Sequence, residues 1–433
     1  MKKSLFVDIA GTFVTRIFLL GASFFVSILL ARLLGPEGKG IVTAVFVIPN
    51  IIISLADLGI RQSTAYFIGK KIFEKEAILS SVSFIWIITS IISIVIVAIY
   101  YSTGPNEIYG WGILSIAILT IPLFLIQQYA NGILQGLQHI GAINKMQIGM
   151  TFVNIIGIVL LVWLMKLDII GAALVQLLIA LYVAVYSIFL IKKNIRFSFK
   201  KAYPSIQKQL FTKGIAYAVT LFILNLNYKI DIIFLERLTN KSDVGIFSVG
   251  TSLAELIWQI PAAIGMVLFS KSANTTSERE SVLRAAQLLR ITTFLLIFIC
   301  GIFWVASPVL VSILYGNDYL AAINVIRYLL PGILIMVIFK ILNADLAGRG
   351  YPLFALSAYS IPLVVNIVLN IYLIPKYGID GAAIASSISY SIGGITFALI
   401  YSKKEQVKLK DLLIVNMSDF NKMVSKFKKI RKH

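Results

Sequence analysis

Long apolar segments recur along the whole chain, separated by short polar ones. Each holds about 20 predominantly apolar residues, the length that an α-helix needs to cross the hydrocarbon core of a bilayer. The pattern therefore predicts twelve membrane-spanning helices and an all-α integral membrane protein. The expected spans are 10–31, 41–60, 78–100, 111–133, 146–165, 170–191, 214–235, 246–268, 291–314, 324–346, 353–374 and 380–401.

Two pairs of segments indicate an internal repeat. The stretch ARLLGPEGKGI (31–41) resembles ERLTNKSDVGI (236–246) at an offset of 205, and VNIIGIVLLVWLMKLDIIGAA (153–173) resembles VNIVLNIYLIPKYGIDGAA (365–383). Six spans in each half make the repeat parallel, with its axis along the membrane normal and a site expected between two lobes. The expected parts are an N-terminal lobe over 1–191, a basic cytoplasmic linker over 192–213, a C-terminal lobe over 214–402 and a basic amphipathic cytoplasmic tail over 403–433.

Composition and charge support a membrane protein and suggest its orientation. Hydrophobic residues make up 59% of the chain and charged residues 13%, and the net charge is +20. Most basic residues fall in segments that are cytoplasmic if the amino terminus is inside. We therefore expect a protein of the cell membrane with both termini in the cytoplasm. Anionic lipids at the cytoplasmic face are then the expected partners of this charge, and nucleic acid is not.

The end of the chain and its scarce metal ligands allow two further expectations. Apolar residues recur with a helical period from Leu413 to Phe427 among lysines, which predicts a helix lying in the membrane interface. A solvated, disordered tail is the alternative. One cysteine and two histidines leave no obvious ligand set, so neither a metal nor another cofactor is expected.

Polar residues form stripes at helical spacing inside three of the predicted spans. An ionisable residue near the bilayer centre costs at least about 2.5 to 3.5 kcal/mol, so it normally faces a cavity or a partner. We interpret the stripes as walls of a water-filled cavity, although serines, threonines and asparagines also bond across packed helices. Asp57 and Arg61 have the spacing and order of an intrahelical ion pair. The stripes comprise Thr12, Arg16, Ser23 and Ser27; Thr43, Asn50, Ser54, Asp57 and Arg61; and Ser248, Ser252, Glu255 and Gln259.

Further polar residues lie in the fourth, seventh and tenth predicted spans. In LNYKIDIIFLER, Lys229 and Asp231 are two residues apart and point about 200° apart on a helix, so they do not neutralise each other. We expect the Lys229 face to meet the cavity and the Asp231 face to meet a neighbouring helix. The Asn131 amide could bond sugar hydroxyls or a neighbouring helix. Lys340 could line the cavity or extend towards the cytoplasm, and Asp345 could be solvated.

Three segments resemble the polysaccharide transporters, the bacterial flippases for undecaprenyl-pyrophosphate-linked oligosaccharides. This family belongs to the multidrug/oligosaccharidyl-lipid/polysaccharide exporter superfamily. The resemblance implies two pseudo-symmetric six-helix lobes in a V-shaped, MATE-like arrangement, a central cationic cavity and alternating access without enzymatic catalysis. It rests on ARLLGPEGKGIVTAVFVIPNIIISLADLGI, IDIIFLERLTNKSDVGIFSVGTSLAELIWQIP and LYGNDYLAAINVIRYLLPGIL.

The resemblance also implies a cargo, partners and site residues. Cargo would move from the inner to the outer leaflet for surface polysaccharide synthesis, with an ion gradient as the energy source and other polysaccharide-assembly proteins as further partners. The candidate ion-coupling residues are Glu255, Asp231 and Asp57. The candidate substrate-binding residues are Arg16, Lys229, Asn50, Ser252, Glu255, Gln259, Asn131 and Lys340.

Two other functions fit the pattern of spans less well. A multidrug or cation antiporter of the same superfamily would favour an acidic cavity, whereas Arg16, Lys229 and Lys340 are basic. A membrane polymerase or ligase of the polysaccharide pathway would carry its catalytic groups on a large outer loop. The outer loops predicted here are short, which argues against such an enzyme.

Overall fold

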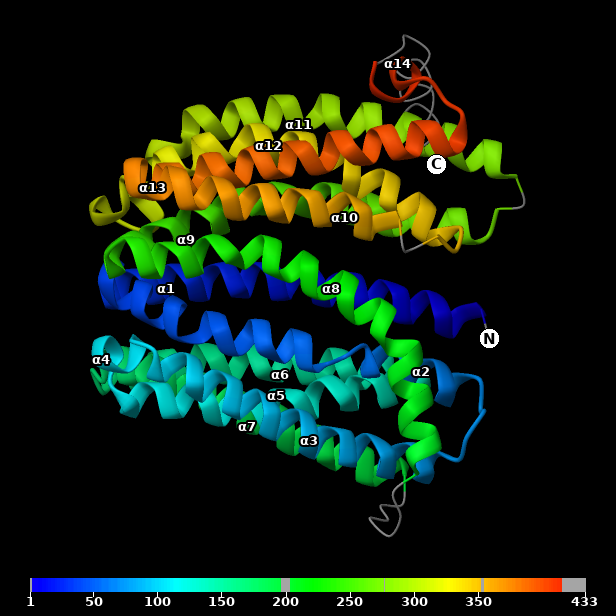
Figure 1. The fold of residues 1–433 in the computed structure, drawn as a ribbon, viewed down its shortest axis with the longest axis horizontal. Coiled ribbons are helices and arrows are strands. Elements are labelled where there is room, and N and C mark those ends of the chain that lie inside the picture. The colour runs from blue at the N-terminus through cyan, green and yellow to red at the C-terminus, as the bar shows by residue number, and fades with distance from the viewer. Residues whose placement is uncertain (1, 196–202, 276, 352–353, 415–433) are drawn as a thin grey trace. The chain divides into compact units, whose positions relative to one another are not determined.

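The computed structural model describes the backbone of residues 2–195, 203–275, 277–351 and 354–414, and these ranges are helical without any strand (Figure 1). The side chains of residues 2–14, 16, 17, 106, 216, 217, 220, 221, 357 and 358 also lie outside the described part. Packing divides the chain into two compact units, Met1–Ser248 and Val249–His433. Each unit is described here by itself.

The first unit is built around the long helix α1. This helix is Lys2–Ala56, and its backbone leaves the helical conformation at Gly35, where φ is 66°. It packs against α3, α5, α6, α7 and α8. The other elements of the unit are α2 (Ile60–Gly69), α3 (Lys75–Ser102), α4 (Pro105–Tyr109), α5 (Trp111–Gly136), α6 (Ile140–Gly157), the π-helical η1 (Ile158–Leu164), α7 (Asp168–Asn194), α8 (Pro204–Leu238) and the start of α9 (Lys241–Glu255).

In the second unit, α12 is the central helix. It packs against α10, α11 and α13 and is buried along most of its length. The long helix α13 changes direction at Gly378, where φ is 54°. The elements of this unit are the end of α9, the 3-10 turn η2 (Leu256–Trp258), α10 (Gln259–Ala273), α11 (Glu278–Leu314), the 3-10 turn η3 (Asn317–Tyr319), α12 (Ala322–Gly348), α13 (Phe354–Glu405) and α14 (Leu409–Leu413).

The described helices fit a protein that crosses a membrane many times. Nine of them are long and apolar enough to span. Two of these, Phe18–Gly69 and Phe354–Glu405, have 52 residues each, or about 78 Å of helix at 1.5 Å per residue, so each can cross a core of about 30 Å twice. Helix α8 adds a further element of 35 residues. The all-helical membrane fold is confirmed, and the twelve predicted spans are consistent with it.

Some helices extend beyond the spans predicted from hydropathy. Helix α11 begins at Glu278, well before the expected start at 291, because the Ser277 side chain caps it by accepting the backbone N–H of Glu280 at 3.3 Å. Helix α8 begins at Pro204, inside the segment expected to be a linker. Proline suits the first turn of a helix, where its missing N–H has no partner to lose. An apolar window detects only the part of a helix that lies in hydrocarbon.

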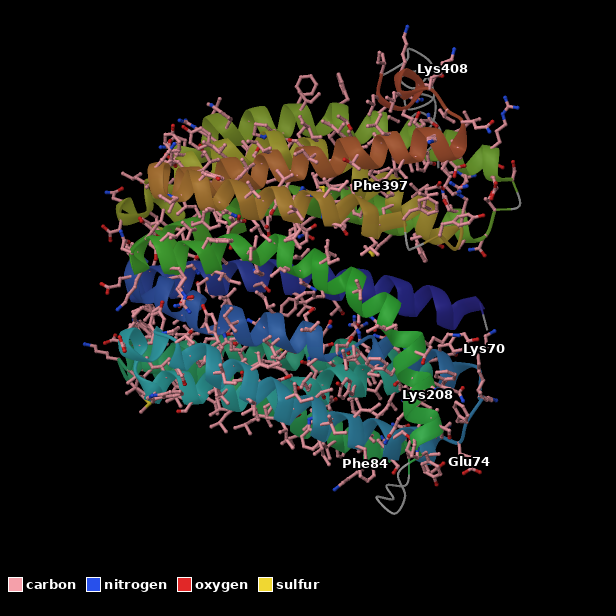
Figure 2. The ribbon with its side chains drawn as sticks, in the orientation of Figure 1. Lys70, Glu74, Phe84, Lys208, Phe397 and Lys408 are labelled. Carbon is pink, nitrogen blue, oxygen red and sulfur yellow. The ribbon has the colours of Figure 1, made fainter. Side chains whose placement is uncertain are left out.

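Exposed apolar side chains identify faces that suit lipid. On α3 they recur along one face, and each is between 50% and 62% exposed: Ile88, Ile91, Ile92, Val95 and Ile99. Such a face would be unfavourable in water but is expected against acyl chains. Charged side chains such as Lys70, Glu74 and Lys208 gather instead at one end of the first unit (Figure 2). The predicted interfacial helix after Leu413 falls almost wholly on residues 415–433, outside the described residues.

Contacts inside the units reproduce the sequence repeat. In the first unit a Cβ at Gly171 would lie 2.9 Å from the Leu161 carbonyl oxygen, and in the second a Cβ at Gly381 would lie 2.3 Å from that of Leu373. The aligned segments place Gly381 over Gly171 and Leu373 over Leu161. The two halves of the chain therefore turn between helices in the same way.

A second contact, between the segments 31–41 and 236–246, is reciprocal. A Cβ at Gly40 would lie 1.8 Å from the Lys241 carbonyl oxygen, and one at Gly245 would lie 2.0 Å from that of Pro36. At the offset of 205, Lys241 corresponds to Pro36 and Gly245 to Gly40. Both contacts lie within the first unit, and each segment thus offers its partner the same surface.

Candidate functional site

A polar cavity of about 280 Å³ lies in the first unit where α1, α2, α5 and α8 approach one another. Amide, hydroxyl and charged groups gather here on helices whose buried residues are mostly apolar. The cavity is lined by Asn50, Ile53, Ser54, Asp57, Arg61, Phe124, Gln128 and Asn225.

A left-handed turn between α1 and α2 positions the two charged residues of this cavity. Leu58 and Gly59 have φ values of 47° and 66°. A Cβ at Gly59 would lie 2.0 Å from the Gly214 carbonyl oxygen, so the turn sits directly on the backbone of α8. Asp57 precedes the turn and Arg61 follows it. The continuous helix assumed for an ion pair between them is therefore wrong, although the Arg61 charge still acts on the Asp57 carboxylate.

Asp57 has an unused acceptor in this wall of the cavity. The residue is only 6% exposed, and within the described part of the chain its Oδ1 accepts no hydrogen bond. Beside it, the Asn225 amide of α8 donates to Ser54 Oγ at 2.9 Å, which joins α8 to α1. Tyr129 of α5 donates its hydroxyl to the Ala56 carbonyl at 2.8 Å. These bonds hold three helices in place around an incompletely satisfied carboxylate.

The charges of α8 lie on two different faces, as the sequence predicts. The Lys229 side chain is exposed, whereas Asp231 is 2% exposed and Asn227 is fully buried. At the end of the helix, Glu236 accepts a hydrogen bond from the Tyr100 hydroxyl of α3 at 2.9 Å. The exposed Lys229 and the buried Asp231 thus lie in different surroundings, and Glu236 ties α8 to its own unit.

The second unit carries the other predicted polar stripe. Ser252 and Gln259 are exposed and Glu255 is half-buried, while Ser248 is buried and belongs to the first unit. The 3-10 turn η2 interrupts the helix between Glu255 and Gln259. Pro261 lacks the N–H that would bond back to this turn, which accounts for the change. The stripe is therefore not one continuous helical face.

Other predicted residues have different surroundings. The Lys340 ammonium lies 4.2 Å from the centroid of the Trp258 ring, a cation–π contact within the second unit. Asn131 is 8% exposed in α5 and does not line the cavity, and its Oδ1 accepts no hydrogen bond among the described residues. The side chain of Arg16 lies outside the described residues.

Six cavity residues were not among the candidate binding or coupling residues, although Ser54 and Arg61 belong to a stripe that was predicted to line a cavity. The six are Ile53, Ser54, Arg61, Phe124, Gln128 and Asn225. Phe124 and Gln128 are four apart and share a face of α5, a spacing that is visible in the sequence. The signal was weak because Gln127 and Asn131 compete with Gln128 for the same role. Asn225 is recognisable only after α8 is placed against α1.

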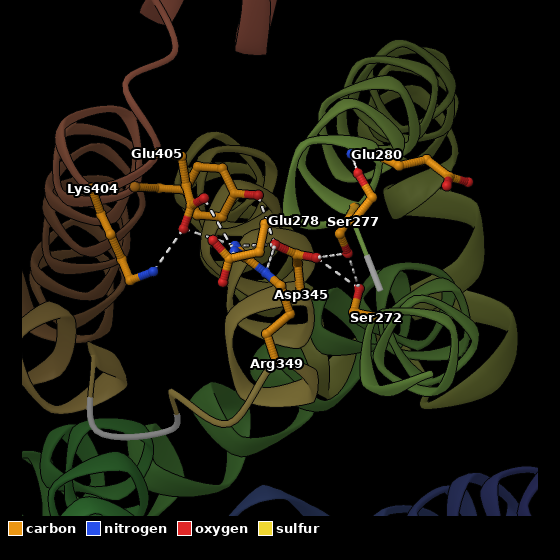
Figure 3. Close-up of polar contacts among 10 residues, drawn as sticks. Ser272, Ser277, Glu278, Glu280, Asp345, Arg349, Lys404 and Glu405 are labelled. Carbon is orange, nitrogen blue, oxygen red and sulfur yellow. Dashed lines mark hydrogen bonds and ion pairs between the residues drawn. The ribbon is translucent and has the colours of Figure 1, made fainter. Parts of the chain in front are cut away.

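A separate buried ionic cluster joins four helices of the second unit at Asp345, which is fully buried (Figure 3). Its carboxylate accepts hydrogen bonds from Ser272, Ser281 and Tyr401 at 2.6 to 2.7 Å. Arg349 lies 2.7 Å from the carboxylate and also forms a bidentate pair with Glu405 of α13. Sequence reasoning left Asp345 open to a solvated position, and the structure shows an internal one. The charged groups of Asp345 and Arg349 thus have hydrogen-bond partners, and the cluster holds the four helices together.

Two family models and several known proteins are similar to this chain in sequence. The model of the family described as "Polysaccharide biosynthesis protein" matches residues 2–269, and the MatE family model matches residues 216–372. A putative O-antigen transporter of Shigella flexneri is 22% identical over 86% of this chain and 92% of its own length. A probable low-salt glycan biosynthesis flippase of Haloferax volcanii is 25% identical over 94% of this chain and 85% of its own length.

Solved structures share the fold at low sequence identity. An inward-facing multidrug resistance MATE family transporter is similar with a TM-score of 0.74 at 16% identity, over 89% of this chain and 94% of the other. The lipid II flippase MurJ in an inward closed conformation has a TM-score of 0.72 at 17% identity, over 94% of this chain and 89% of the other. These likenesses place the chain in the fold of both transporters.

Proposed function

Because the chain belongs to the polysaccharide biosynthesis protein family, we propose that it is a flippase that carries a lipid-linked oligosaccharide across the membrane. The cargo we propose is an undecaprenyl-pyrophosphate-linked oligosaccharide that moves from the inner to the outer leaflet by alternating access. The polar cavity of the first unit carries this proposal, because it offers hydrogen-bonding groups among helices that are otherwise apolar. Two relatives named as an O-antigen transporter and a glycan flippase support it.

Lys229 supplies a positive charge suited to the pyrophosphate of such a cargo. Its ammonium is exposed on α8, a helix long enough to cross the membrane. An exposed charge on a membrane-spanning helix is unfavourable against acyl chains and favourable against water or an anion. Ser252, Gln259 and Glu255 of the second unit are accessible to sugar hydroxyls, and the buried Asp231 and half-buried Glu255 remain our candidates for ion coupling.

A multidrug exporter is the second candidate function. The MatE family match over residues 216–372 favours it, and the fold is common to both activities. The exposed Lys229 is the observation against it, since a basic residue would repel a cationic drug. A polymerase or ligase has less support, because the named relatives are a transporter and a flippase and no catalytic group is expected.

Flipping should be measured in proteoliposomes that contain the full chain and lipid-linked oligosaccharides in both leaflets. Access of an enzyme added outside to the sugars reports movement between leaflets, with and without a proton or sodium gradient. We expect transport that depends on the protein and becomes faster with one of the gradients. Efflux of a cationic dye without movement of any lipid-linked sugar would instead establish the exporter.

Lys229→Ala is expected to lower the flipping rate by about tenfold to a hundredfold, because a charge-assisted bond to phosphate is worth about 1.5 to 3 kcal/mol. Lys70→Ala is the matched control, since it removes the same charge from an exposed position at the end of α2. Initial flipping rates at equal protein content provide the measurement. A Lys229→Ala variant as fast as the control would remove Lys229 from the cargo site.

A further inference from the structure

The cavity of the first unit has the size and chemistry of a site for one sugar ring. Its volume of about 280 Å³ lies just below the range of about 300 to 1,000 Å³ that is usual for drug-sized ligands. A single sugar ring is of a size that this volume holds. The cavity also lies wholly within the first unit, so all its walls belong to one packed body.

The wall chemistry matches a polyhydroxylated ligand. Asn50, Gln128 and Asn225 offer both donors and acceptors, and Arg61 offers only donors. Each sugar hydroxyl both donates and accepts, so it needs such a mixture. The Phe124 ring adds an apolar surface for the C–H face of a ring.

Asp57 adds the strongest acceptor. A carboxylate accepts shorter and stronger hydrogen bonds than a neutral oxygen does. Burying one of its oxygens without a partner is costly, and Asp57 Oδ1 is such an atom in the described part of the chain. A pair of ligand hydroxyls would satisfy it. A phosphate would not, because its negative charge would meet the carboxylate.

We infer that this cavity recognises one neutral hexose or N-acetylhexosamine residue of the cargo, with Asp57 accepting hydrogen bonds from its hydroxyl groups. This inference rests on the proposed function and deepens it, because it separates sugar recognition in the cavity from pyrophosphate binding at Lys229, which does not line the cavity. Asp57, predicted from the sequence as an ion-coupling residue, then binds cargo. Arg61, which follows the turn between α1 and α2, and Gln128 of α5 then hold the ring in position.

Equilibrium binding of lipids to the full chain in detergent micelles tests the inference. The probes are undecaprenyl pyrophosphate without sugar and the same lipid bearing one N-acetylglucosamine, one glucose or one galactose. The wild-type protein should bind at least one sugar-bearing lipid about tenfold more tightly than the bare lipid. Asp57→Asn should bring this ratio to near one and leave binding of the bare lipid unchanged, because bonds to a charged acceptor are worth about tenfold or more.

Two further variants make the result decisive. Asp168→Asn removes an equal charge from an exposed position of the same unit and should leave the ratio unchanged. Gln128→Leu tests the same cavity through a neutral, half-buried residue. If the Asp57→Asn protein is not monodisperse in size-exclusion chromatography, Gln128→Leu becomes the deciding variant. An unchanged ratio in the deciding variant, or an equal loss of affinity for bare and sugar-bearing lipids, would overturn the inference.

The flipping assay separates this outcome from failure of the proposed function. If the wild-type protein moves lipid-linked sugars but binds none of the three more tightly than the bare lipid, the sugar site is wrong and the flippase stands. If it moves no lipid-linked sugar at all, the flippase proposal fails and the sugar site fails with it.

Discussion

Asp345→Ala is expected to lower the free energy of unfolding by about 3 to 5 kcal/mol, the usual effect of removing one partner from a buried ion pair. The carboxylate accepts hydrogen bonds from Ser272, Ser281 and Tyr401, and all of these would lose their acceptor together. Arg349, whose side chain is only 4% exposed, would keep Glu405 as its close carboxylate partner. Denaturant unfolding in detergent micelles, followed by tryptophan fluorescence, measures the change.

Glu278→Ala is the matched control for Asp345→Ala. Glu278 also faces Arg349, but at 3.9 Å and with a side chain 68% exposed. Exposed ion pairs contribute about 0 to 1 kcal/mol, so this variant should unfold almost as the wild type does. Equal effects of the two substitutions would show that the cluster around Asp345 does not hold the four helices together.

Gly40→Ala and Gly245→Ala are expected to destabilise the protein strongly and by similar amounts. The added methyl groups would lie 1.8 Å and 2.0 Å from backbone carbonyl oxygens, which can be relieved only by moving a helix. Overpacking of this kind costs about 1 to 3 kcal/mol or more. Because both substitutions strain one shared contact, the double variant should lose less than the sum of the two losses.

Gly21→Ala provides the comparison for these glycine variants. It lies within α1, and a Cβ there would meet no atom within 4 Å. Replacing an exposed helical glycine by alanine usually stabilises a helix by about 0.5 to 1 kcal/mol. Unfolding curves of the four variants would therefore separate in opposite directions. A Gly40→Ala protein as stable as Gly21→Ala would rule out a tight contact between the two segments.

The membrane fold was predictable because nearly every residue of a membrane-spanning helix has to be apolar, so each span leaves a long signal in the sequence. Runs of about 20 apolar residues leave few alternatives to a helix in lipid, and the repeated GAA at Gly171 and Gly381 was visible without a structure. The opposite placement of Lys229 and Asp231 followed from the angle between residues two apart. These inferences needed only local geometry.

The cavity was less predictable because it depends on how four helices are rotated about their axes. Asn225 and Ser54 are 171 residues apart and meet only after α8 packs on α1. The left-handed turn at Leu58 and Gly59 also changed the relation of Asp57 to Arg61, since a helical spacing rule does not hold across such a turn. The burial of Asp345 was not predicted, because a position near the end of a helix says little about whether other helices cover it.

The reciprocal contact of Gly40 and Gly245 bears on how such a chain arose. In a twofold-symmetric homodimer every contact occurs twice. If residue i of one subunit touches residue j of the other, then residue j of the first subunit also touches residue i of the second. Gly40 with Lys241 and Gly245 with Pro36 have this relation within one chain. A half-length ancestor that paired through this surface would already have possessed the contact. Gene duplication and fusion would then have joined two copies of it, after which the two halves were free to diverge.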